Sequence, residues 1–296
     1  MMACVANGQV SLTAIFVGFG LAAGLIDVAM NIEAVAVEQR FDRRVMSAMH
    51  GTWSVFVFAG AAVAAAGVAA GIPFHVHLPV LAVVILLTSF PVLRWLPVSD
   101  TADARTSTSS VPSPLTPVGR VVLLCLIAGA VFLAEGIALE WSALYLRGSV
   151  GTDAGTASLG VVAFSAGMVG SRFAGDRLAA RIGQPTIVRV GTSAGALALA
   201  TALIVGGAAP AIVALGVLGL GLGPIVPSVF RSAGSVALRG GRTALPIVVT
   251  AGYAGSIVGP LVVGFVADVA GLRAAFILPV IANAVAALAA SAARDP

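Results

Sequence analysis

The sequence predicts an all-α integral membrane protein, a helical bundle with about nine transmembrane helices. Charged residues make up 9% of the chain, against roughly 25% in an ordinary soluble domain. Hydrophobic residues make up 59%, and the mean hydropathy is +1.07. The apolar residues also gather into stretches that are long enough to cross a hydrocarbon core of roughly 30 Å as helices. So few charges could not cover a water-facing surface, so the composition requires a bilayer.

Nine apolar stretches follow one another along the chain. They cover residues 11–37, 45–70, 77–97, 119–145, 156–178, 185–206, 209–231, 244–267 and 272–292. Each is expected to be a helix, because an open strand edge in lipid would leave backbone polar groups unpaired. The 35 glycines suit helices that pack closely in a membrane. Pro224 and Pro227 are expected to bend the seventh helix, which then either acts as a gate or is static.

The arginines predict how the chain crosses the membrane. All sixteen basic residues are Arg; fourteen fall in the connections of one side, and only Arg147 and Arg273 fall on the other. By the positive-inside rule the fourteen mark the cytoplasm. This predicts a multi-pass protein of the cytoplasmic membrane, with an external N-terminus of this chain and a cytoplasmic C-terminus. Since the arginines form no basic stripe, we expect no nucleic-acid partner.

One long polar connection, rich in Ser, Thr and Pro, divides the stretches into three and six. We therefore expect a partial N-terminal half-bundle over 1–97, a cytoplasmic linker over 98–118 and a six-helix half-bundle over 119–296. A protein of two six-helix halves would carry such a linker at its middle, so the first stretches would correspond to helices 4–6, with helices 1–3 lacking. A natural nine-helix protein is the alternative.

A faint repeat relates the two parts. Gly20-x-x-x-Gly24 recurs as Gly219-x-x-x-Gly223, and the pair Gly51 and Trp53 has counterparts in Gly252 and Tyr253. Repeated halves are typical of secondary transporters.

Several side chains within the first two stretches are candidates for substrate binding or proton coupling. Asp27 and Asn31 are four residues apart and share a helix face. A carboxylate near the bilayer centre costs roughly 2.5–3.5 kcal/mol on insertion scales, so it usually faces a bundle interior or an aqueous cavity. His50 has a side chain that can transfer protons near neutral pH, and Trp53 can stack on a ring-shaped substrate. Packing, a structural hydrogen bond and an interfacial position are the respective alternatives.

The later stretches add further candidates. Glu135 and Trp141 in the fourth stretch, with Tyr253 in the eighth, combine an acid with aromatic rings, which suits a polar organic substrate. Glu38 and Glu140 are expected at the membrane rims. A charged group at the end of the fifth stretch is expected to form a cytoplasmic gate, with positive-inside anchoring as the alternative; its members are Arg172, Asp176, Arg177 and Arg181.

The sequence contains no motif that predicts an enzyme. It has no zinc-ligand spacing, no phosphate-binding loop and no convincing Ser-His-Asp set. Cys4 and Cys125 both lie in apolar stretches, which argues against a disulfide or metal framework. We expect no cofactor and no metal.

The chain resembles the major facilitator superfamily, through its six-loop-six organisation and the Gly175-Asp176-Arg177 cluster. It is most similar to the fucose-permease-like branch. Four stretches carry this similarity: 24–31, 46–54, 140–146 and 221–227. The resemblance implies that an acid in the helix equivalent to helix 4 handles substrate or proton, and Asp27 matches that position. Trp53 matches a polar position of the fucose transporter.

These observations together predict a secondary active transporter, symporter or antiporter, for a small polar solute. The solute is expected to be sugar-like or another metabolite, or a drug in efflux, with protons as a candidate coupling ion. We expect a monomer. The alternatives are an inactive, truncated remnant of such a transporter and a ten-helix drug/metabolite-type transporter.

Overall fold

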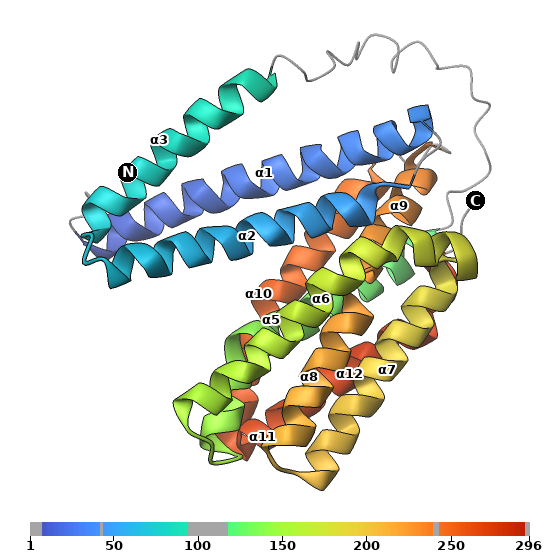
Figure 1. Cartoon of the computed structure of the whole chain (residues 1–296). Helices are drawn as coiled ribbons and strands as arrows, with labels where there is room; N and C mark the ends of the chain where they lie inside the picture. Colours follow the sequence, from blue (N-terminus) through green and yellow to red (C-terminus); the bar gives the residue numbers. More distant parts are fainter. Residues whose placement is uncertain (1–7, 42–43, 94–117, 239–242, 294–296) are drawn as a thin grey trace. The chain divides into compact units, whose positions relative to one another are not determined.

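The structure, a computed structural model, describes residues 8–41, 44–93, 118–238 and 243–293 (Figure 1). Over these ranges the chain forms helices joined by short turns, with no strand. In chain order they are α1 (Gln9–Phe41), α2 (Met46–Ala69), α3 (Phe74–Leu93), α5 (Val118–Gly148), α6 (Ala154–Ile182), α7 (Gln184–Val205), α8 (Ala208–Leu222), α9 (Ile225–Leu238), α10 (Ala244–Ala270), α11 (Leu272–Ala275), α12 (Ile277–Ala289) and the 3₁₀ turn η2 (Ala290–Ala293). The predicted all-α membrane class is confirmed.

Seven helical segments of the described residues are long and apolar enough to cross a membrane. They include α1, α5, α6, α7, α10, the α8–α9 pair and the α11–η2 run, and α3 contributes a shorter apolar helix over His75–Pro91. The nine predicted stretches each coincide with a helix or with a broken helix. The eight segments above account for eight of them, and α2 accounts for the ninth. The number of nine is therefore approximate. The predicted linker lies outside the described residues, except that Val118 begins α5.

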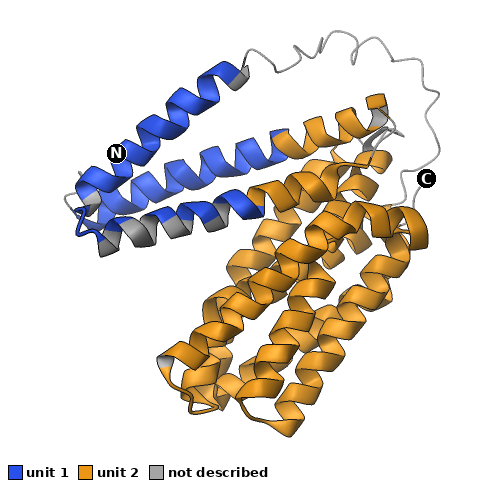
Figure 2. Cartoon of the chain, in the orientation of Figure 1, with its two compact units in different colours: residues 1–29, 54–112 blue, residues 30–53, 113–296 orange. Residues whose placement is uncertain are grey.

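The chain divides by its contacts into two units, shown in Figure 2. Unit 1 comprises residues 1–29 and 54–112, and unit 2 comprises 30–53 and 113–296. The end of α1 and the start of α2 thus group with the later helices. The half-bundle division at the linker stays a prediction.

In unit 1, α2 and α3 meet at a tight turn. Gly71 has a φ of +69°, a backbone conformation that favours glycine, and the backbone N–H of Ile72 donates to the Gly67 carbonyl at 2.9 Å. The His77 ring lies against Gly67 so closely that a Cβ there would overlap it. Glycine therefore lets α3 fold back onto the end of α2.

In unit 2, glycines bring helix backbones into direct contact. A Cβ added at Gly219 of α8 would overlap the backbone oxygen of Phe164 on α6. Gly191 of α7 and Gly221 of α8 each face the other's carbonyl group in the same way. These approaches are typical of membrane helices, where close packing replaces the hydrophobic driving force. In the other copy of the repeat, a Cβ at Gly20 would meet no described atom within 4 Å.

The predicted bend in the seventh stretch is a break between α8 and α9. The last α8 hydrogen bond runs from the N–H of Gly223 to the Gly219 carbonyl, and Pro224, which has no N–H, separates the two helices. The α9 helix then continues to Leu238, seven residues beyond the predicted end at 231. Arg231 consequently lies inside a helix and not in a connection.

Candidate functional site

A group of charged side chains lies where α1, α2, α6 and α9 meet in unit 2. The Nε and Nη2 atoms of Arg231 on α9 donate to the two carboxylate oxygens of Glu38 on α1, at 2.5 and 2.7 Å. Nη2 also donates to Oδ1 of Asp176 on α6 at 2.8 Å. The three side chains are only 9–12% exposed. We call these residues, Glu38, Asp176 and Arg231, the Arg231 cluster.

The same two carboxylates cap the N-terminus of α2. Oε1 of Glu38 accepts the backbone N–H groups of residues 45 and 46, at 2.7 and 2.8 Å. Asp176 accepts those of residues 47 and 48, at 3.3 and 3.1 Å. The first N–H groups of a helix have no partner within it, and the helix dipole favours negative charge at this end. The Arg231 cluster therefore joins the start of α2 to three other helices, α1, α6 and α9.

Gly175 makes this approach possible. A Cβ at this position would lie 2.7 Å from Oγ of Ser47 and 2.9 Å from Cβ of Pro224. Real Cβ contacts are essentially never shorter than 3.0 Å. The glycine that precedes Asp176 in the sequence motif thus allows the carboxylate to reach the start of α2.

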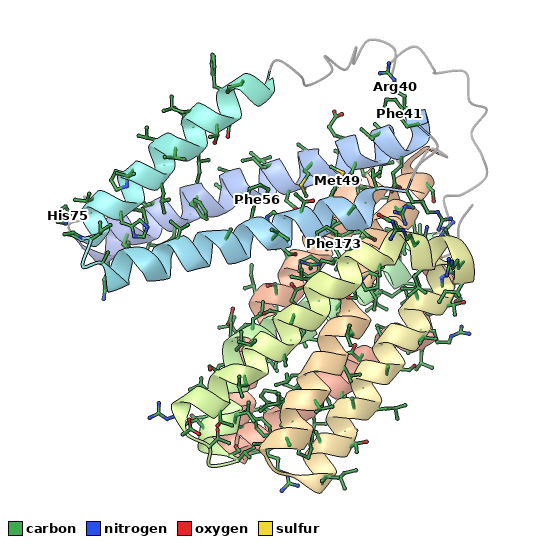
Figure 3. All side chains as sticks on the ribbon, viewed as in Figure 1. Arg40, Phe41, Met49, Phe56, His75 and Phe173 are labelled. Atoms are coloured by element: carbon green, nitrogen blue, oxygen red, sulfur yellow. The ribbon has the colours of Figure 1, made fainter. Side chains whose placement is uncertain are left out.

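A second glycine allows α2 to approach α6 closely. A Cβ at Gly51 would lie 3.2 Å from the ring of Phe173, which Figure 3 labels on α6. Gly51 is one of the positions that the repeat indicated.

A buried ion pair lies one turn before Asp176 on α6. Nη2 of Arg172 is 3.5 Å from Oε1 of Glu135 on α5, and the two side chains are 6% and 16% exposed. Both residues lie within membrane-spanning helices. His50 on α2 interacts electrostatically with Arg172 of the ion pair and with Asp176 of the Arg231 cluster.

Aromatic rings continue from His50 across the bundle. The imidazole Nε2 of His50 is hydrogen-bonded to Oδ1 of Asn31 at 3.1 Å, and its ring centroid is 6.0 Å from that of Phe230. Phe132 lies 6.4 Å from Phe230 and 5.8 Å from Tyr253. We call these four rings, His50, Phe132, Phe230 and Tyr253, the aromatic row. Phe132 precedes Glu135 by three residues, so the row and the ion pair share a face of α5.

The structure brings some of the predicted substrate or proton residues together. Asn31, His50 and Tyr253 lie along the aromatic row, and Glu135 lies beside it. Three others lie elsewhere. The Trp53 side chain is 54% exposed, the Trp141 ring packs 3.6 Å from where a Cβ at Gly264 would be, and Asp27 belongs to unit 1.

The residues of the predicted gate have different partners in the structure. Asp176 pairs with Arg231, while Arg172 pairs with Glu135. Arg177 and Arg181 are exposed, and no ion pair between described residues joins either to Asp176. The expectation that these two residues belong with Asp176 in one charged group therefore does not match the geometry.

Two members of the Arg231 cluster were not recognised from the sequence. The sequence predicts Glu38 at a membrane rim and Arg231 among the charges of a connection. The available signal was an Arg placed four residues after Pro227 in an apolar helix, because a charge inside a span usually has a specific partner. Among the described residues, no group of three or more His, Cys, Asp or Glu could hold a metal ion.

Comparison with known proteins shows the family of this chain. No profile of a known protein family matches the chain. An uncharacterized transporter, y4wD, of Sinorhizobium fredii is 36% identical over 264 residues, which are 88% of this chain and 68% of that protein. An uncharacterized MFS-type transporter of Yersinia pestis is 31% identical over 258 residues, or 87% and 66% of the two chains. The chain belongs to the major facilitator superfamily.

A third relative of this superfamily member is the membrane protein MosC of Rhizobium meliloti, 29% identical over 272 residues. The chain spans about two thirds of the length of these relatives, between 65% and 68%. Membership decides against the ten-helix drug/metabolite alternative and confirms the resemblance that the sequence indicated.

Solved structures support the same fold. The superfamily transporter FucP in its outward conformation matches with a TM-score of 0.54 at 18% identity, over 61% of this chain and 44% of FucP. A second structure, of the E. coli fucose:proton symporter FucP, matches with a TM-score of 0.53 at 19% identity. At this identity the likeness establishes the fold of this membrane transporter chain.

Proposed function

We propose that this protein is a secondary active transporter that moves a small polar solute across the cytoplasmic membrane and couples it to protons. The buried Glu135–Arg172 pair carries this proposal, because both charges lie inside membrane-spanning helices. Charged residues at such depth are costly and are usually part of a substrate or proton pathway. A structural ion pair would need no neighbouring binding surface, whereas this pair borders the aromatic row.

The aromatic row supplies the chemistry of a solute site. Ring faces bind apolar sugar or ring surfaces, and His50, Asn31 and Tyr253 carry polar atoms for hydrogen bonds. Small-molecule sites commonly combine apolar walls with a few polar groups in this way. The related fold of a fucose:proton symporter makes fucose the first solute to test, with other metabolites and drug efflux as the alternatives. Asp27, Trp53 and Trp141 remain proposed contributors.

Glu135 is proposed to bind and release the coupling proton. Arg172 keeps its charge because a guanidinium group is not deprotonated in proteins. Protonation of Glu135 would remove the negative partner and change the relative free energies of the inward-open and outward-open states. Proton binding would thereby be linked to alternating access.

The Arg231 cluster is the proposed cytoplasmic gate. It joins α1 and α2, which we assign to the N-terminal half, to α6 and α9 of the C-terminal half. Opening toward the cytoplasm would require these contacts to break, as in other rocking-bundle transporters. We place the C-terminus and the arginine-rich connections on this side of the cytoplasmic membrane, with a monomer as the working unit.

The test is proton flux in proteoliposomes that contain the chain 1–296 and a pH-sensitive dye. We expect external L-fucose, or another sugar from a panel, to produce solute-dependent proton entry that Glu135→Gln abolishes. Glu140→Gln is the matched control, because Glu140 lies on the same helix and is exposed. Equal flux in both variants would overturn the coupling role of Glu135.

The competing proposal is a membrane protein that does not transport. Correctly folded protein, shown by circular dichroism and a single gel-filtration peak, would then produce no flux with any solute of the panel.

A further inference from the structure

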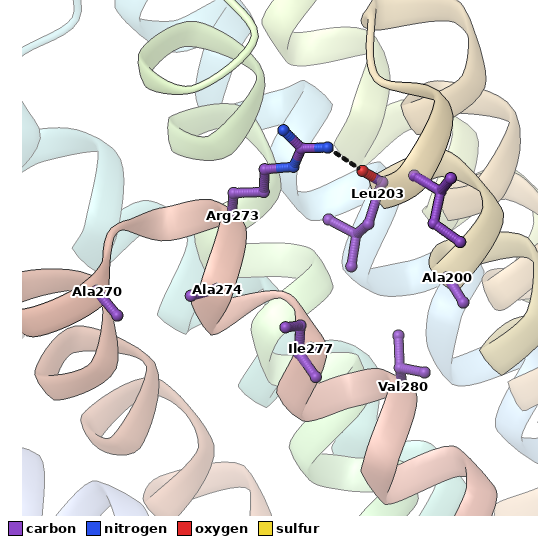
Figure 4. Close-up of a pocket in the computed structure, with 8 residues that line it drawn as sticks. Ala200, Leu203, Ala270, Arg273, Ala274, Ile277 and Val280 are labelled. Carbon is purple, nitrogen blue, oxygen red and sulfur yellow. Dashed lines mark hydrogen bonds between the residues drawn. The ribbon is translucent and has the colours of Figure 1, made fainter.

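An open, mostly apolar groove lies on unit 2 at the ends of three membrane-spanning helices. Its volume is about 540 Å³, and its walls include Ala200, Leu203, Ile204, Ile277 and Val280. Figure 4 shows Ala200 and Leu203 of α7 facing Ile277 and Val280 of α12, with Arg273 at one end. The volume lies within the range of roughly 300–1,000 Å³ that is common for small-molecule sites.

Among the described residues that line the groove, Arg273 alone is charged. Its Nη2 atom donates to the carbonyl oxygen of Leu203 at 2.5 Å (Figure 4). This contact places the guanidinium group at the end of the apolar wall. A guanidinium group has five N–H donors, so one backbone contact leaves donors for an anion, and the side chain is exposed.

The groove lies at a membrane edge. The spans of α7 and α10 end at Val205 and Ala270, and the span that contains Arg273 begins at Leu272. Residues at the ends of spans lie near the lipid headgroups, where Arg side chains are stable. The apolar wall therefore runs from the headgroup level into the hydrocarbon region.

The distribution of arginines along the sequence supports a binding role for Arg273. Arg273 is one of only two arginines that the sequence places on the non-cytoplasmic side. Positive-inside anchoring does not account for a cation there. A binding role for its charge accounts for both its position and its fixed geometry.

We propose that this groove binds one anionic phospholipid, with the phosphate on Arg273 and an acyl chain along Leu203, Ile277 and Val280. Arginine and phosphate form strong, charge-assisted hydrogen bonds that are often bidentate. The apolar wall gives the acyl chain a fixed surface in place of the mobile lipid around the protein. This inference does not depend on the proposed transport activity.

The test is native mass spectrometry of the detergent-purified chain 1–296, titrated with phosphatidylglycerol or with phosphatidylcholine of the same acyl chains. We expect tighter binding of phosphatidylglycerol. Arg273→Gln should lower that affinity about fivefold, which corresponds to about 1 kcal/mol for one basic residue at an anionic lipid surface. Arg147→Gln is the matched control, because Arg147 is the other arginine of this side, is exposed and does not line the groove.

A second variant tests the apolar wall separately. Ala200→Leu narrows the groove and leaves Arg273 intact, so it should lower binding of both lipids. Arg273→Lys should keep part of the phosphatidylglycerol preference, since it retains the charge. Equal binding of the two lipids, equal effects of the two Arg→Gln changes, or no effect of Ala200→Leu would each overturn the proposal.

Discussion

Nη2 of Arg231 on α9 donates to Oδ1 of Asp176 on α6 at 2.8 Å, and the same nitrogen donates to Glu38 on α1. One cation thus faces two carboxylates. The N-terminus of α2, to which both carboxylates bind, adds roughly half a positive charge through the helix dipole. The charges of the cluster are therefore nearly balanced only when α1, α2, α6 and α9 are together, which suits contacts that open and close as a unit.

Removal of Arg231 is expected to destabilise the protein strongly. Arg231→Gln leaves two nearly buried carboxylates without their cation, and the loss of one partner from a buried pair typically costs about 3–5 kcal/mol. The measurement is the free energy of unfolding in mixed detergent micelles. Arg177→Gln, on the exposed side of α6, should change this free energy by less than about 0.5 kcal/mol. Equal stability of the two variants would contradict the assigned contacts.

The same Gly→Ala substitution at two positions of α6 should change the stability of the protein in opposite directions. Gly175→Ala places a methyl group 2.7 Å from Oγ of Ser47, so it should destabilise by about 1–3 kcal/mol, as overpacking does. Gly170→Ala meets no described atom within 4 Å and should stabilise the helix by about 0.5–1 kcal/mol. Thermal unfolding of both variants checks the pair. A neutral Gly175→Ala variant would show that α2 does not approach α6 here.

The hydrogen bond between Asn31 and His50 should contribute to stability. Asn31→Leu removes the acceptor from a buried imidazole, which typically costs about 1–3 kcal/mol. Thr52→Val is the control, because the Thr52 hydroxyl is exposed and donates to the Ala48 carbonyl of its own helix. Chemical unfolding of the purified variants measures the difference, and similar midpoints would speak against the bond.

The predicted orientation can be tested with single cysteines in a chain from which Cys4 and Cys125 have been removed. Ser149, in the turn after α5, and Arg181, near the end of α6, are both exposed. A membrane-impermeant maleimide should label Ser149→Cys in intact cells and Arg181→Cys only after the membrane is opened. The reverse pattern would invert the assigned topology.

Much of the fold was predictable because the bilayer restricts what an apolar chain can form. The nine stretches correspond to helices, since lipid leaves no other partner for backbone polar groups. Boundaries were less predictable. The sequence predicts an end of the seventh stretch at 231, whereas α9 runs to Leu238. A charge inside a helix is tolerated when other elements supply its partners, and their positions are tertiary information.

The site was predictable in its residue types and less so in its pairing. Glu135, His50 and Asp176 are candidates from the sequence because polar groups in apolar stretches are costly, whereas the sequence predicts Glu38 at a membrane rim. Its partner, Arg231, is 193 residues away in the chain, a distance that no local pattern can span.

The sequence by itself determined the membrane environment and the helical class, because composition and hydropathy depend only on which residues are present. Its similarity to known proteins determined the superfamily. Tertiary structure alone decided that Arg172 pairs with Glu135 and that Arg231 joins Asp176 to Glu38. It also decided that Arg273 closes an apolar groove. The physical reason is that each of these groups acts through a partner on another helix, and the partner is selected by packing between helices.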